Sequence, residues 1–97
     1  MTQPHEDEAA AWVATEITRL RNLSYDDLLL LRNQPEHRPM KTADGKTLGL
    51  EIQVVWDNHR EQRNLRVVVD VWDPSKRISR SIVKDDFIRA PDGSFVG

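Results

Sequence analysis

The sequence has no cysteine and no long apolar run, and each absence excludes a class of protein. Without cysteine there are no disulfide bonds, thiolate metal sites or cysteine nucleophiles. Apolar runs such as Leu28–Leu31 and Val67–Val69 fall far short of the roughly 20 residues of a membrane-spanning helix. Residues 1–12 also lack the basic leader and apolar centre of a secretory signal. We therefore expect a cytoplasmic protein with no membrane segment.

The sequence also has little net charge. Fourteen Lys and Arg against sixteen Asp and Glu give a formal net charge of −2, which argues against a partner bound mainly by electrostatic attraction. Hydrophobic residues make up 38% of the 97 residues, which is enough for one modest core in a single domain. So short a chain leaves little room for a deep active-site cleft.

In the first third of the chain, the spacing of the apolar residues is typical of two helices. Residues 5–22 carry apolar side chains at three- and four-residue spacing, which predicts one helix with a single apolar face. These apolar positions are Ala10, Val13, Ile17 and Leu20. A second helix is predicted over residues 25–32, where Ser24 and Asp27 form a capping-box pattern.

The rest of the chain changes to the two-residue period of strands. The predicted strands cover residues 37–42, 47–57, 64–73 and, with a less regular interior, 77–84. Asp44-Gly45 is a hairpin signal between the first two strands. Residues 85–97 are interpreted as a C-terminal turn segment. The sequence thus predicts an α+β fold, in which two N-terminal helices pack on one face of a three- or four-stranded antiparallel meander sheet.

The dipeptide Trp-Asp occurs twice, at Trp56 and Trp72, and strand register decides whether the two copies are alike. A hairpin that pairs Trp56 with Leu65 places apolar residues opposite one another along both strands. The other apolar pairs are Val54 with Val67, Ile52 with Val69, and Leu50 with Val71. We therefore expect Trp56 on the core face and Trp72 on the opposite face, across from Gly49. Two copies are also too few for a β-propeller, whose blades need roughly 40 residues each.

The second face of the predicted sheet carries an apolar strip edged by charges. Its residues include Val55, Arg66, Val68 and Trp72. A covered tryptophan buries roughly 150–250 Å², so the fate of Trp72 is informative. Three alternatives remain open: the C-terminal segment covers it with Phe87 or Phe95, a protein covers it, or a ligand or nucleic-acid base stacks on it.

Few residue patterns point to catalysis or to a bound metal. The three histidines share no spacing that suits zinc, and they are His5, His37 and His59. The paired carboxylates fit a helix start at Asp26-Asp27 and the cap of a short helical turn at Asp85-Asp86. The sequence has no phosphate-binding loop, dinucleotide glycine motif or serine nucleophile elbow. We expect no enzymatic activity, cofactor or metal.

The sequence therefore predicts a small, non-enzymatic protein-interaction or regulatory module. We expect it to bind a protein partner, or a second copy of itself as a homodimer, through the second sheet face. The predicted partner-binding residues are Val55, Arg66, Val68 and Trp72.

The alternative prediction is a module that binds single-stranded nucleic acid on the same face. Its predicted contacts are Arg66, Trp72, Lys76 and Arg77. Residues 58–84 contain seven Lys and Arg against three Asp and Glu, a local charge of +4. These basic residues are divided between the two ends of the predicted hairpin.

Overall fold

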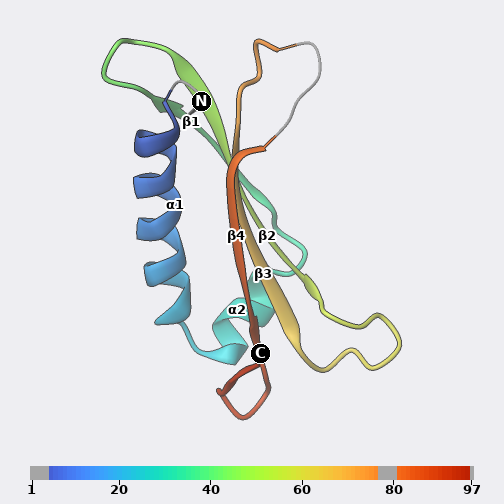
Figure 1. Ribbon diagram of the computed structural model, residues 1–97. Coiled ribbons are helices and arrows are strands. Elements are labelled where there is room, and N and C mark those ends of the chain that lie inside the picture. Colours follow the sequence, from blue (N-terminus) through green and yellow to red (C-terminus); the bar gives the residue numbers. More distant parts are fainter. Residues whose placement is uncertain (1–4, 77–80, 97) are drawn as a thin grey trace.

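Two helices cover one face of a five-stranded sheet in the computed structural model, which describes residues 5–76 and 81–96 (Figure 1). The helices are α1 (Glu6–Arg21) and α2 (Tyr25–Leu31), and the strands are β1 (Glu36–Lys41), β2 (Thr47–Trp56), β3 (Leu65–Trp72), β4 (Ser81–Arg89) and β5 (Phe95–Val96). Each strand pairs antiparallel with its neighbour in the chain. The predicted α+β class and antiparallel meander are confirmed, and the sheet has one strand more than the largest number predicted.

Helix α1 runs along the sheet and packs on β3 and β4 (Figure 1). Its buried apolar residues are Ala9, Val13, Ile17 and Leu20. The prediction of Ala10 in this stripe is wrong, because Ala9 lies four residues before Val13 and continues the same helix face, while Ala10 is exposed. None of the described helices is long and apolar enough to cross a membrane.

Helix α2 begins at the predicted cap. The Oγ atom of Ser24 accepts a hydrogen bond of 3.1 Å from the backbone N–H of Asp27. The side chain of Leu28, in this helix, is fully buried. The Tyr25 hydroxyl donates to the carbonyl of Arg63 at 2.6 Å, so α2 is tied to the loop between β2 and β3.

The predicted pairing of β2 with β3 is confirmed. Trp56 pairs with Leu65, and Leu50 with Val71. The buried residues of this hairpin alternate along both strands and comprise Leu48, Leu50, Ile52, Val54, Leu65, Val67, Val69 and Val71. Trp56 lies at the end of the same face, half-buried against the core, with the Arg32 guanidinium 5.0 Å from its ring centroid. The helices therefore cover the face that the register predicts.

Strand β4 extends through residues 85–89, which the sequence assigned to a turn segment. Asp85 and Asp86 lie inside this strand, opposite Val69 and Val68, so they do not cap a helical turn. The pairing with β3 shifts by one residue between Val71 and Trp72, which breaks the regular alternation of the strand. The first half of the predicted strand 77–84 lies outside the described residues, and the chain returns as β5 beside the end of β4.

Two hairpin loops, residues 43–45 and 91–93, share one geometry. The N–H of Thr42 donates to the carbonyl of Lys46, and that of Ala90 to the carbonyl of Ser94, both at 2.8 Å. The third loop residue is glycine in each case, with φ near +90°. The predicted hairpin at Asp44-Gly45 is therefore present, with a loop of three residues.

Candidate interaction surface on the open sheet face

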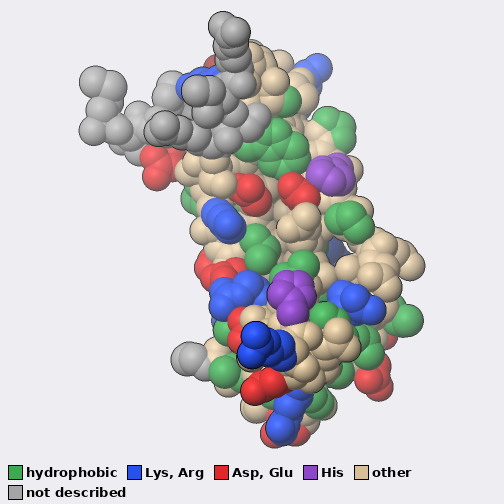
Figure 2. Space-filling view, turned by 90° about the vertical axis from the view of Figure 1, so that its right-hand side faces the viewer, with side chains coloured by type: hydrophobic (Ala, Val, Ile, Leu, Met, Phe, Trp, Pro, Cys, Tyr) green, Lys and Arg blue, Asp and Glu red, His purple; other side chains and the backbone are tan. Residues whose placement is uncertain are grey.

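Alternate residues of the strands form the sheet face that no helix among the described residues covers. It comprises His37 and Pro39 of β1; Gly49, Glu51, Gln53 and Val55 of β2; Arg66, Val68, Asp70 and Trp72 of β3; Lys84, Asp86 and Ile88 of β4; and Val96 of β5. We call this surface the open face. Figure 2 looks onto this side of the molecule and shows apolar, acidic and basic side chains mixed together. No single sign of charge dominates it.

The four predicted partner-binding residues all lie on the open face, but they do not form one continuous strip. Val55 is 38% exposed and pairs with Arg66, and the half-buried Val68 is the next outward residue along β3. Trp72 lies six residues beyond Arg66 on β3, a separation of roughly 20 Å in an extended strand. Between the valines and Trp72 lie the carboxylates of Glu51 and Asp70.

Trp72 is half-buried, and its cover comes from the neighbouring strands. The indole lies on Gly49, where an added Cβ would be 2.7 Å from Trp72 Cζ2. The His37 ring of β1 meets the indole edge-on, with centroids 6.0 Å apart. A groove of about 190 Å³ adjoins this contact and is also lined by Pro39 and Pro74. The tryptophan is therefore anchored within the sheet and still borders a groove.

The interpretation that Phe87 or Phe95 covers Trp72 is wrong. Phe87 is buried on the helix face, and Phe95 packs against it with ring centroids 5.8 Å apart. Two guanidinium groups contact the Phe95 ring, with Arg21 at 4.3 Å and Arg89 at 4.5 Å from its centroid. These aromatic residues fix the C-terminal hairpin to α1, on the far side of the sheet from Trp72.

A row of charged side chains crosses the centre of the open face. It contains His37, Glu51, Asp70 and Lys84, one from each of the first four strands. Glu51 and Asp70 lie directly opposite each other, an arrangement of like charges that is unfavourable in isolation. His37 Nε2 lies 3.6 Å from Glu51 Oε1. The Oδ1 atom of Asp70 is covered and has no hydrogen-bond partner among the described residues.

Arg66 is held by two carboxylates of its own chain. Its Nε and Nη2 atoms donate to Asp57 Oδ1 at 3.2 and 2.8 Å, and its Nη1 atom donates to Asp86. The hydrogen bonds to Asp57 and Asp86 raise the pKa of Arg66 above its ordinary value. The guanidinium is therefore permanently charged and oriented on the open face.

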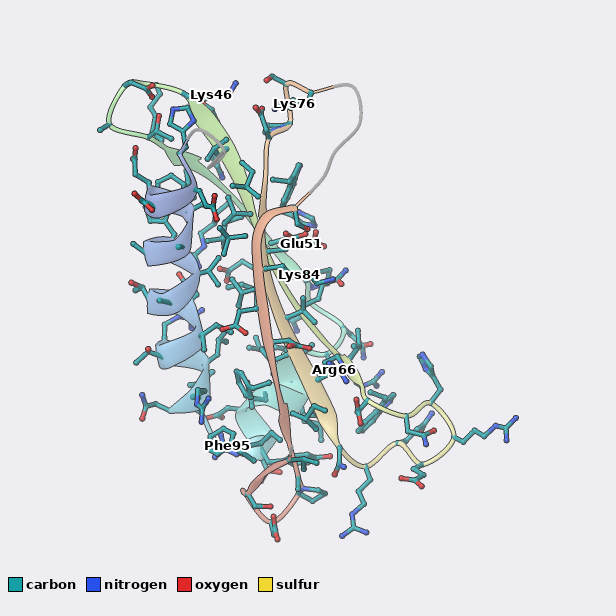
Figure 3. The ribbon with its side chains drawn as sticks, viewed as in Figure 1. Lys46, Glu51, Arg66, Lys76, Lys84 and Phe95 are labelled. Atoms are coloured by element: carbon teal, nitrogen blue, oxygen red, sulfur yellow. The ribbon has the colours of Figure 1, made fainter. Side chains whose placement is uncertain are left out.

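The residues predicted to contact nucleic acid do not come together. Figure 3 shows Lys76 and Lys46 at one end of the sheet and Arg66 well toward the other. Lys46, which the sequence did not single out, is paired with Asp73 at 3.0 Å. Arg77 lies outside the described residues. The basic residues of this side are thus spread along the sheet, and two of them, Lys46 and Arg66, are paired with carboxylates.

Glu16 is a buried acid, but its partners give it a structural role. It is 8% exposed between α1 and β1, accepts from Arg19 Nε at 2.8 Å and also binds Arg38. Burial alone would raise the pKa of Glu16, but the hydrogen bonds from Arg19 and Arg38 outweigh burial and lower it. No three of His, Asp and Glu gather as metal ligands in the part of the chain that the structure describes.

Comparison of the chain with protein-family models, with curated proteins and with solved structures finds no match. Sequence reasoning identified this face but missed the contact of Trp72 with Gly49. The signal for it was a glycine directly opposite a tryptophan in the predicted register.

Proposed function

We propose that the chain is a non-enzymatic protein-interaction module that binds a protein partner through the open face. The observation that carries the proposal is the one-sided cover of the sheet by the described helices. Val55 and Val96 are 38% and 40% exposed on the uncovered side, with Val68 and Ile88 half-buried beside them. Val55 lies on one side of Arg66, and Ile88 and Val96 lie on the other. Exposed apolar side chains on an uncovered sheet face favour a surface that a partner covers.

The two edges of the sheet favour binding through the face over strand addition. The edge strand β1 contains Pro39, which has no N–H to donate to an added strand. At the opposite edge, the two residues of β5 pair only with Ile88 and Arg89 of β4, and the rest of β4 carries the exposed charges of Lys84, Asp85 and Asp86. Proline and charged residues are both features that discourage edge-to-edge pairing.

The alternative of single-stranded nucleic-acid binding has weaker support. Arg66 is engaged by Asp57 and Asp86 and lies roughly 20 Å from Trp72 along the strand. A stacking platform needs a guanidinium or ammonium group close to the aromatic ring. We also propose that the module is cytoplasmic, as the sequence predicts.

Two measurements test the proposal: affinity capture from cell extract, and then binding of the purified partner. Both are made on wild type, Val55→Asp and Leu30→Asp. Val55→Asp places a carboxylate on the open face. Leu30→Asp is the matched control, because Leu30 is 71% exposed on α2, away from that face. We expect a partner that binds wild type and Leu30→Asp equally and binds Val55→Asp at least about tenfold more weakly.

A partner that binds Val55→Asp as tightly as wild type would contradict the proposal. So would the absence of both a captured partner and self-association. Salt-dependent binding of a single-stranded oligonucleotide, weakened by Trp72→Ser, would favour the nucleic-acid alternative.

A further inference from the structure

We draw no further inference here: the strongest candidate, the groove of about 190 Å³ beside Trp72 on the open face, belongs to the surface already described, and nothing in the structure shows what covers it.

Discussion

The indole of Trp72 lies on the backbone of Gly49, its direct partner across the pairing of β2 with β3. Glycine permits this contact because it has no Cβ. The ring therefore shields the backbone of β2 while its edge faces His37 of β1. Trp72 thus contributes to the packing of the sheet, and the groove beside it is part of the open face.

Substitution of Gly49 by alanine should destabilise the fold through this contact. The new methyl group would come within 2.7 Å of Trp72 Cζ2, so the indole or the strand must move. We expect Gly49→Ala to lower the free energy of unfolding by about 1–3 kcal/mol, as measured by urea denaturation. In a Trp72→Leu background the same change should cost less than about 1 kcal/mol. An equal cost in both backgrounds would show that the ring is not the cause.

The buried ion pair between α1 and β1 should respond unequally to loss of its two arginines. Arg38→Met removes a guanidinium bound to Glu16, which is 8% exposed. We expect a loss of about 1–2 kcal/mol in the free energy of unfolding, because a buried carboxylate keeps fewer donors. Arg19→Met, at a more exposed side chain, should cost less than about 1 kcal/mol. The double variant Glu16→Leu with Arg38→Met should recover much of the loss, and a further loss would contradict this account.

Two turn aspartates should make the fold sensitive to acid. Hydrogen bonds lower the pKa of Asp73 to about 2, chiefly from the Ser75 hydroxyl, and the pKa of Asp44 to about 2, chiefly from His5. In the unfolded chain an aspartate titrates near pH 3.9. Because the folded pKa is the lower one, the stabilisation is fully present above about pH 4 and is lost as the pH falls toward about 2.

Urea denaturation at a series of pH values measures this loss. Ser75→Ala removes the main donor to Asp73 and should flatten the fall in stability between about pH 4 and 2. Ser81→Ala, at an exposed position of β4, serves as the control and should leave the slope unchanged. A slope unaffected by Ser75→Ala would show that Asp73 does not contribute to it.

The hydroxyl of Tyr25 should hold the loop between β2 and β3 against the second helix. Tyr25→Phe removes the 2.6 Å hydrogen bond to the Arg63 carbonyl, which should cost about 1 kcal/mol. We expect faster amide exchange over residues 57–64, measured by hydrogen–deuterium exchange. Thr15→Ala removes only a bond to the Ala11 carbonyl within α1, and it should leave exchange in this loop unchanged. Unchanged loop exchange in Tyr25→Phe would contradict the role assigned to the hydroxyl.

The pairing of β2 with β3 could be predicted from sequence because its apolar residues alternate without a break. A slip by one residue would bring Asp70 onto the core face, so one register is strongly specified. The same register placed Trp72 opposite Gly49. The register did not specify the orientation of the indole ring, since that depends on the side chains of β1.

The extent of β4 could not be predicted because its helix-facing side mixes charged and apolar residues. Asp85 and Arg89 alternate with Phe87 on that side, which hides the period of a strand. Arg89 is accommodated there because its guanidinium donates to the carbonyls of Gly93 at 2.7 Å and Arg21 at 3.0 Å. Partners that the fold brings together from distant parts of the chain are not visible in a local pattern.

Hydroxyl-radical footprinting of the assembled and the dissociated protein locates the binding surface, whether the chain assembles with a captured partner or with a second copy. We expect the reactivity of Val55, Val68 and Trp72 to fall on assembly while that of Leu30 on α2 does not change. Equal reactivity of the open face in both states, or protection of Leu30 in its place, would show that the open face is not the binding surface.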